Sequence, residues 1–439
     1  MDTPIDRAIV EEKIKEVGLS NVGKASIREL VKLVNLIEKA TGKRFIRMEM
    51  GVPGLPPAKV AIEAEKRALD SGVASIYPNI EGIRPLKEEA SRFIKLFMNL
   101  DVHPLHCVPS AGSMMGAMAC FLVANRNDKN KEGTLFIDPG FPVQKQQIRM
   151  LGQECRSFDV YNYRGEKLEA KLESYLKTGK VSTILYSNPN NPSWICFNED
   201  ELKIIGRLAN KYDCIVIEDL AYFGMDFRKD YSVPGEPPYQ PTVGHYTDNY
   251  ILLISSSKAF SYAGQRASVM AISDKLFERR YPDLLRYYSS DRFGHSMIFG
   301  ALYGLSSGIA HTVQYGLAAV LKAVNDGEYR FLDEVKDYKE KAVEMKKIFL
   351  ANGFRIVYDR DLDEILADGF YFTISYPGMS GAQLLERLLY YGISAITLDI
   401  TGSERHEGLR ACVSLVTREQ FPELEERLAQ FHKDYPIKS

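Results

Sequence analysis

The spacing of hydrophobic positions predicts helices over the first part of the chain. Residues 5–41 carry an apolar stripe at helical spacing, with one break near Gly18–Gly23. The Gly/Pro segment Met50–Pro57 then excludes regular structure. Two further periodic stretches predict helices over Ala58–Ser71 and Ile83–Phe97, so the chain up to that point is expected to be mainly helical.

From about residue 106 the pattern changes to short β-branched runs that are separated by helical segments. The runs are Gly133–Pro139, Val181–Pro189, Cys214–Tyr222, Asn249–Lys258 and Arg266–Ser273. Nearly continuous apolar strands that alternate with helices are typical of a largely parallel α/β sheet, covered by helices on both faces. Ligands of such sheets bind beyond the carboxyl ends of the strands, so polar residues at those ends are candidates for a functional site.

The last part of the chain predicts a second, smaller domain. A long helical stretch covers Tyr329–Asn352, and strand-like runs at Gly369–Pro377 and Leu409–Val416 precede an amphipathic helix from Pro422. A length of 439 residues also favours two domains over one. We therefore expect N-terminal helices that join the small domain over residues 1–50, a large domain over 51–325 and a small α+β domain over 326–439.

Composition and charge exclude several classes of function. Lys and Arg number 56 and Asp and Glu 58, so no overall field attracts nucleic acid or an anionic membrane. The N-terminus lacks the pattern of a signal peptide, and no apolar run is long enough to span a bilayer. The six cysteines are scattered without metal-ligand spacing. We expect a cytoplasmic protein with reduced thiols, no metal ion, and neither membrane nor nucleic acid as a partner.

The segment SSSKAFSYAGQR, Ser255–Arg266, carries the sharpest chemical signal. Lys258 directly follows an apolar strand, where desolvation lowers the pKa of a lysine and makes its amine a nucleophile toward an aldehyde. Ser255 offers a hydroxyl and Arg266 a fork of donors that suits a phosphate. The alternative is a plain turn with a solvated lysine and an arginine in a salt bridge.

Three further segments place polar groups near strand ends or at a helix start. In IEDLAY, Asp219 ends a buried strand and needs a partner such as a protonated pyridine nitrogen, with Tyr222 three residues later. The alternative is a helix-capping or arginine-paired Asp. In SNPNNP an Asn donates to a ligand or simply forms a turn. In PSAGSMMGAM the N–H groups of Gly112 and Ser113 open a helix and suit an anion, although this signal is weak alone.

In their order along the chain, N-P-x-N-P, D-x-x-Y and S-x-x-K followed by G-x-R resemble the class I/II aminotransferases. These are the aspartate aminotransferase-like enzymes of fold type I among pyridoxal-phosphate-dependent proteins. The resemblance extends from a G-x-P segment at Gly51 to the strand LRACVS near the C-terminus. It implies a mostly parallel, seven-stranded-type sheet flanked by helices in the large domain, and a smaller α+β domain from the two termini.

The resemblance also implies the reaction and the cofactor. The cofactor is pyridoxal 5′-phosphate, held as a Schiff base on Lys258, and an amino group moves between an α-amino acid and a 2-oxo acid. Lys258 then shuttles the substrate proton, and Asp219 pairs with the pyridinium nitrogen. Asn191 and Tyr222 bind the phenolate oxygen of the ring, and Phe141 stacks on it.

The remaining implied contacts hold the phosphate and the substrate. The residues that bind the phosphate are Ser255, Arg266, Gly112 and Ser113, with Tyr77 from the neighbouring subunit. Arg410 clamps the α-carboxylate through two parallel hydrogen bonds, and Gly51 and Asn191 also line the substrate site. A contribution by Tyr77 of a neighbour implies a homodimer with shared active sites.

Departures from the family pattern leave the substrate open. Ser193-Trp194 follows N-P-x-N-P where the family usually has a small pair, so Trp194 either narrows the pocket or packs on the turn. Arg286 and Arg292 are possible ligands of a distal carboxylate, although the plainer interpretation is that both are surface or interface arginines.

A pyridoxal-phosphate-dependent C–S lyase, or another eliminating enzyme on the same fold, remains the alternative function. It shares every residue named above. The aminotransferase-like sensor domain of transcription regulators is disfavoured because no basic helix-turn-helix precedes Gly51.

Overall fold

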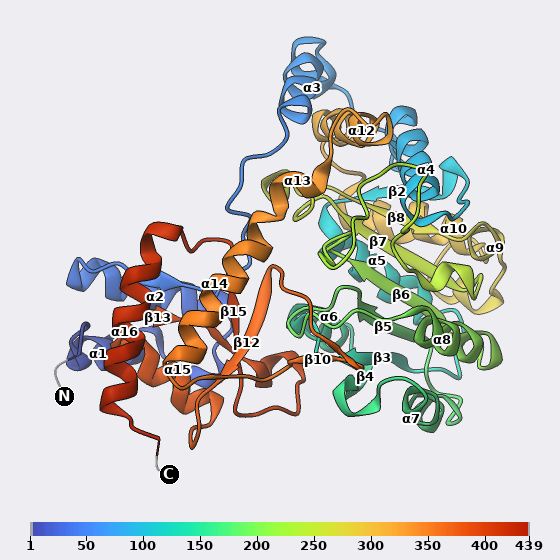
Figure 1. Cartoon of the computed structure of the whole chain (residues 1–439). Helices are drawn as coiled ribbons and strands as arrows, with labels where there is room; N and C mark the ends of the chain where they lie inside the picture. Colours follow the sequence, from blue (N-terminus) through green and yellow to red (C-terminus); the bar gives the residue numbers. More distant parts are fainter. Residues whose placement is uncertain (1–2, 438–439) are drawn as a thin grey trace. The chain divides into compact units, whose positions relative to one another are not determined.

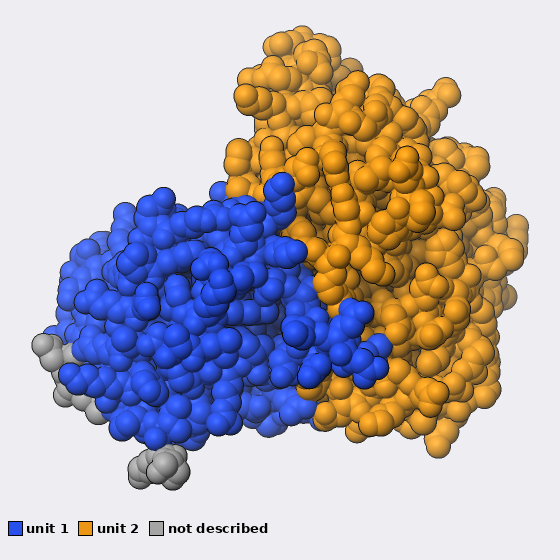
Figure 2. All heavy atoms as spheres, viewed as in Figure 1, with its two compact units in different colours: residues 1–54, 191–195, 336–439 blue, residues 55–190, 196–335 orange. Residues whose placement is uncertain are grey.

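The computed structural model describes residues 3–437 and divides the chain into two compact units (Figure 2). Unit 1 consists of Met1–Gly54, Asn191–Ile195 and Lys336–Ser439, and unit 2 of Leu55–Asn190 and Cys196–Val335. Unit 1 therefore combines the two ends of the chain with a short segment from its middle. In the described part of the chain, no helix has the length and apolar character that crossing a lipid bilayer requires.

Unit 2 is built on a seven-stranded sheet with the order β2-β8-β7-β6-β5-β3-β4 (Figure 1). The strands are β2 (Cys107–Ser110), β3 (Gly133–Asp138), β4 (Glu154–Asp159), β5 (Thr183–Ser187), β6 (Ile215–Leu220), β7 (Tyr250–Ser255) and β8 (Ser268–Ile272). The pairs from β4 through β7 are parallel, whereas β8 runs antiparallel to both β7 and β2. This mixed, mostly parallel sheet with flanking helices, together with a smaller second unit, confirms the predicted fold class.

Helices bury the apolar strands of this sheet. The longer helices of unit 2 are α3 (Lys59–Asp70), α4 (Arg84–Met98), α5 (Gly112–Ala124), α6 (Pro142–Met150), α7 (Lys167–Leu176), α8 (Glu199–Lys211) and α12 (His311–Asn325). Helix α5 is apolar almost all round, because it packs against β6, β7 and β8 and is itself covered by the π-helical segment η8 (Ser296–Leu302). Its first residue lies directly after β2, at the edge where the candidate residues gather.

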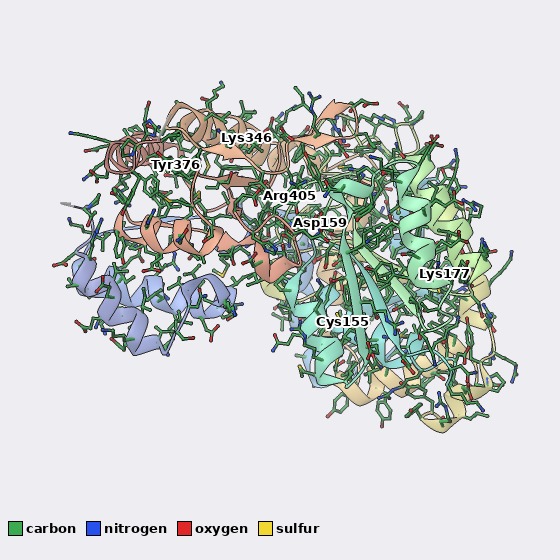
Figure 3. The ribbon with its side chains drawn as sticks, turned by 90° about the horizontal axis from the view of Figure 1, so that it is seen from below. Cys155, Asp159, Lys177, Lys346, Tyr376 and Arg405 are labelled. Carbon is green, nitrogen blue, oxygen red and sulfur yellow. The ribbon has the colours of Figure 1, made fainter. Side chains whose placement is uncertain are left out.

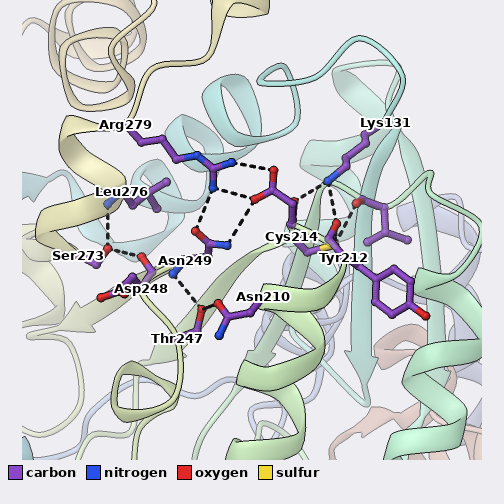
Figure 4. Close-up of polar contacts among 12 residues, drawn as sticks. Lys131, Asn210, Tyr212, Cys214, Thr247, Asp248, Asn249, Ser273, Leu276 and Arg279 are labelled. Atoms are coloured by element: carbon purple, nitrogen blue, oxygen red, sulfur yellow. Dashed lines mark hydrogen bonds and ion pairs between the residues drawn. The ribbon is translucent and has the colours of Figure 1, made fainter.

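The amino ends of the central strands are closed by a polar network (Figure 4). Asp213, just before β6, accepts hydrogen bonds of 2.7 and 2.8 Å from the guanidinium of Arg279. Lys131 donates to the carbonyl oxygens of Tyr212 and Asp213, at 3.0 and 2.5 Å. Thr247 donates at 2.6 Å to Asn210. These groups satisfy one another at the end of the sheet opposite the carboxyl ends of the strands.

Unit 1 has a four-stranded antiparallel sheet with the order β14-β15-β12-β9. Its strands are β9 (Arg355–Ile356), β12 (Tyr371–Ser375), β14 (Ile396–Thr397) and β15 (Leu409–Cys412). The N-terminal segment joins this unit through β1 (Ile46–Arg47), which pairs in parallel with β13 (Ile393–Ser394). The main helices are α1 (Arg7–Val17), α2 (Ile27–Thr41), α14 (Asp337–Ala351), α15 (Gly381–Tyr390) and α16 (Phe421–Asp434).

The predicted long helix over Tyr329–Asn352 is wrong in one respect. The structure has two helices there, α13 (Phe331–Val335) and α14, separated by a turn at Lys336. The chain passes from unit 2 to unit 1 at this residue, so the break coincides with the change of unit. The break expected near Gly18 is confirmed, because Gly18 ends α1 in the left-handed conformation with φ of 81°.

Candidate active site

The carboxyl ends of three neighbouring strands gather polar side chains in unit 2. Ser187 ends β5 and lies opposite Asp219 of β6, and Ser255 ends the next strand, β7. Tyr222 and Lys258 follow β6 and β7 after one or two turn residues. Parallel neighbours bring these residues, far apart in the sequence, to one edge of the sheet.

Asp219 is a buried carboxylate whose contacts hold it in place without neutralising it. It accepts hydrogen bonds from Gln144 Nε2 at 2.8 Å and from the backbone N–H of Ala221 at 3.1 Å. Burial raises the pKa of Asp219 to about 6, and the bond from Gln144 opposes that rise. Within residues 3–437 its hydrogen-bond partners are an amide and a backbone N–H and include no arginine, so the arginine-paired alternative does not hold. A buried carboxylate of this kind suits a cationic partner, which the described residues do not supply.

Helix α6 supplies the polar support of this site, which the sequence analysis missed. Three buried polar residues lie on this short helix. Gln144 donates to Asp219, Lys145 pairs with Asp138 at the end of β3, and Gln147 donates to the carbonyl oxygen of Met114 at 2.8 Å. Polar residues at the start of a helix are ordinary in a sequence, and the burial that distinguishes these three is evident only in the structure.

An anion cradle lies at the N-terminus of α5. Gly112 has φ of 74°, and a Cβ at this position would lie 2.5 Å from Nη2 of Arg266. The Oγ of Ser113 is buried without a hydrogen-bond partner, and no side chain caps the helix. Arg266 donates to the carbonyl oxygen of Ala263 at 2.8 Å, and the described residues offer it no carboxylate. A guanidinium against a helix N-terminus creates strong positive potential that a phosphate would neutralise.

The other residues of unit 2 that are predicted to bind the cofactor differ in their burial. Ser255 is buried and its Oγ accepts from the N–H of Ser257 at 3.2 Å. Tyr222 is buried, and Phe141 directly precedes α6 at the end of the turn after β3. Tyr77 is 91% exposed, so it is not packed against the cradle of its own chain.

Unit 1 holds a buried arginine that has no anionic partner among the described residues. Arg410, on β15, is 1% exposed; it donates to the backbone oxygen of Glu49 at 2.7 Å and to Oδ1 of Asn191 at 3.3 Å. Its guanidinium lies 4.3 Å from the ring centre of Tyr371, and its Nε has no hydrogen-bond partner. Gly51 lies close by, since a Cβ there would meet the Tyr371 hydroxyl at 2.0 Å. A buried cation of this kind is a ready site for a carboxylate.

The two arginines considered for a distal carboxylate are already engaged. Arg292 forms an ion pair with Glu278. Arg286 donates to the carbonyl oxygens of Asp283 and Arg126, at 3.0 and 3.3 Å. Neither is arranged as an unpaired cation that awaits a second carboxylate.

The buried cysteines are not suited to act as nucleophiles. Four of the six are buried, and none of the six forms a disulfide within residues 3–437. Burial raises the pKa of Cys107 to about 12, and it also raises the pKa of the partly buried Cys155, on β4 (Figure 3). The described residues contain no group of three or more His, Cys, Asp or Glu side chains that could hold a metal ion.

Comparisons with known proteins show the family of the chain. The model of the family described as aminotransferase class I and II matches residues 43–433. A probable aspartate aminotransferase of Methanocaldococcus jannaschii is 26% identical over 341 residues, which cover 77% of this chain and 79% of the relative. An LL-diaminopimelate aminotransferase of Natranaerobius thermophilus is 24% identical over 419 residues, which cover 94% and 98%.

Solved structures show the same fold. An aspartate aminotransferase from Thermotoga maritima superposes with a TM-score of 0.75 at 18% identity, covering 96% of this chain and 99% of that one. An alanine aminotransferase from Pyrococcus furiosus gives 0.74 at 19% identity, covering 95% and 99%. The similarity spans nearly the whole chain.

Proposed function

The chain belongs to the class I and II aminotransferase family, whose members depend on pyridoxal 5′-phosphate, and we propose that Lys258, Asp219 and the α5 cradle hold that cofactor here. The observation that carries the proposal is Asp219, a buried carboxylate without an ionic partner in the described chain. The cradle of Gly112, Ser113 and Arg266 supports it, because it suits a phosphate dianion. When bound, the cofactor supplies an aldehyde and an electron-withdrawing ring.

Each residue then has a defined task in the transfer. Asp219 holds the proton on the ring nitrogen, because a buried carboxylate favours a cationic neighbour. Tyr222 donates to the ring oxygen, and Phe141 packs on the ring face. Lys258 would hold the cofactor covalently through its side-chain amine, and that amine, once released, would move the proton at the substrate's α-carbon.

Residues of unit 1 bind the substrate carboxylate in this proposal. We propose that Arg410 binds it through its remaining N–H donors, with Asn191 and Gly51 beside it. Because the Asn191 oxygen accepts from Arg410, its amide nitrogen is the atom that can donate to a ligand. The substrates are an α-amino acid and a 2-oxo acid. The relatives are named for aspartate, diaminopimelate and alanine, so no donor is singled out.

We also propose a cytoplasmic homodimer with shared active sites, in which Tyr77 of one subunit reaches the phosphate of the other. The free thiols support the compartment. A run of exposed apolar side chains in unit 2 supports the dimer, since such a run is unfavourable in water. Its members are Leu285, Tyr287, Phe299, Tyr303 and Leu305.

The absorbance spectrum of the purified protein tests the function directly. The cofactor band should appear, and one amino acid added without a keto acid should convert it stably to the amine form of the cofactor. Lys258→Ala should remove the covalently bound band and abolish turnover, whereas the exposed Lys177→Ala (Figure 3) should change neither.

Two results would redirect the assignment. Steady release of keto acid and ammonia, with the band restored, would favour the C–S lyase or another eliminating enzyme. Absence of the band even after addition of pyridoxal phosphate, or full turnover by Lys258→Ala, would remove Lys258 from its proposed role.

A further inference from the structure

Trp194 has a backbone conformation that a tryptophan rarely adopts. It is the only tryptophan of the chain, and its φ of 65° lies in the left-handed region. Such a conformation is energetically unfavourable and persists only where the surroundings enforce it. The side chain is 0% exposed, so burial of the indole is the compensating gain.

The indole of Trp194 contacts one aromatic ring, and that ring contacts Arg410. Gly369 makes room for the indole, because a Cβ there would lie 2.2 Å from Cε2 of Trp194. The ring of Tyr371, on β12, meets the indole nearly edge-on, at 6.1 Å and 73°. The guanidinium of Arg410 lies over that same ring at 4.3 Å. All four residues belong to unit 1.

We propose that Trp194 is a positioning residue, which acts through Tyr371 to hold the Arg410 guanidinium in place for the substrate carboxylate. This inference rests on the proposed role of Arg410. An aromatic ring restrains a guanidinium by cation–π attraction without occupying any of its N–H donors. The backbone oxygen of Glu49 and Oδ1 of Asn191 take one donor each, so the stack adds restraint while leaving donors for a carboxylate.

Glycine at position 194 would relieve the strained backbone but remove the indole that buttresses Tyr371. A tryptophan that only filled space would affect stability alone. A tryptophan that positions Arg410 would also affect the recognition of carboxylates. The two roles can therefore be separated by measurement.

The first experiment is a crystal structure of Trp194→Gly without cofactor or substrate. We expect the Tyr371 ring to leave the guanidinium, with the separation from Arg410 Cζ increasing beyond the roughly 6 Å limit of a cation–π contact. A ring that keeps its 4.3 Å separation would overturn the inference, whatever the enzyme's activity.

The second experiment compares steady-state kinetics with the amino acid identified by the absorbance titration. Trp194→Gly should raise KM on the order of ten-fold with kcat changed far less, since the lost restraint concerns binding of the carboxylate. Trp194→Phe should recover most of the loss, because it restores a ring. Trp194→Gly should add little to the KM increase of Tyr371→Leu, since the tryptophan acts through that ring. Additive effects would contradict the route through Tyr371.

Gly369→Ala gives an independent test that leaves residue 194 unchanged. The new Cβ would displace the indole and should raise KM in the same way. In the Trp194→Gly background the same change should have no further effect, because the clash has gone. Normal KM in Gly369→Ala, in a protein whose indole has moved, would contradict the inference.

Arg410→Lys separates the inference from the proposed function. If this variant binds substrate normally, the role of Arg410 as the carboxylate ligand fails. If it raises KM while the variants at Trp194 and Gly369 do not, only the positioning role of Trp194 fails.

Discussion

Asp219 and Glu218 are consecutive residues of one buried strand, yet different groups hold their side chains. Gln144 and the N–H of Ala221 bind Asp219, whereas Thr242 Oγ1 at 2.6 Å and the N–H of Val243 at 3.1 Å bind Glu218. Burial raises the pKa of Asp219 to about 6 and that of Glu218 to about 7. One strand thus presents one acid toward the proposed cofactor and buries another that the chemistry does not use.

Asp219→Asn should remove the charge that holds the proton on the cofactor ring. We expect turnover to fall by roughly 10²-fold or more, as when a charge-stabilising group is lost. The native carboxyl takes up a proton below about pH 6, so affinity of the cofactor-free protein for pyridoxamine phosphate should fall from pH 7 to pH 5. When this affinity is measured by calorimetric titration, Asp219→Asn should not show the part of the pH dependence that comes from the carboxyl group. Near-normal turnover would mean that a group other than Asp219 holds the proton on the cofactor ring.

Glu218→Gln should change how stability depends on pH. The pKa of Glu218, about 7 in the folded protein, lies above the ordinary value of 4.5. Between these values the folded protein holds a proton that the unfolded chain has lost, so this group's contribution to stability falls as pH rises from about 4.5 to about 7. The variant lacks this titration, so urea unfolding should show it gaining stability relative to the native protein between pH 5 and pH 8. Exposed Asp200→Asn is the control. Parallel pH curves for the variant and the native protein would contradict the shift.

Individual residues could be predicted where their chemistry is unusual for their position. Lys258 directly follows an apolar strand and Asp219 lies within one, so both stand out in the sequence. Their roles remain predictions. Gln144 could not be found in this way, because an amide in a helix is ordinary and its partner lies 75 positions along the chain. Tyr371 was missed for the same reason, since an aromatic residue in a strand normally indicates only packing.

Elements combine these residues into sites, and α5 is the clearest case. Its uncapped N-terminus faces the Arg266 guanidinium only because residue 112 has no side chain. The apolar runs predicted five strands of the large sheet, β3 and β5 to β8, since strands buried on both faces leave a nearly continuous signal. Strands β2 and β4 were not predicted; β4 is partly exposed and lies at the edge of the sheet. The antiparallel direction of β8 was not predicted, because direction depends on pairing partners rather than on periodicity.

Gly112→Ala should weaken binding of the phosphate. The new Cβ would lie 2.5 Å from Arg266 Nη2 and would displace the guanidinium from the helix N-terminus. We expect the affinity for pyridoxal phosphate to fall on the order of ten-fold or more, as for loss of a charge-assisted hydrogen bond. Gly179→Ala is a matched control, because Gly179 has a similar φ of 67° but nothing within 4 Å. Equal losses in both variants would assign the effect to backbone strain alone.

The whole molecule brings the two ends of the chain into one unit, and this was expected from the family resemblance. The inclusion of Asn191–Ile195 in that unit was not expected, because this segment closely follows β5 of the other unit. Hydrophobic periodicity predicts local structure. A short turn has no such periodicity, so its sequence does not indicate which unit it packs on. Trp194 was therefore left between two interpretations, and its burial against Gly369 became evident only in three dimensions.

The proposed dimer makes a prediction at the scale of the molecule. Phe299 and Tyr303 are 48% and 59% exposed and lie in or directly after the π-helical segment η8. If a second copy covers them, light scattering should give twice the 49.6 kDa of one chain. A Phe299→Asp/Tyr303→Asp double variant should shift toward the monomer, because two charges would be buried without partners. Leu350→Asp, at a similarly exposed apolar position of α14 in unit 1, should leave the mass unchanged.

If Tyr77 completes the phosphate site of the neighbour, the monomeric variant should also bind pyridoxal phosphate more weakly. A native protein that remains monomeric at micromolar concentration and binds the cofactor fully would refute both the dimer and the shared site.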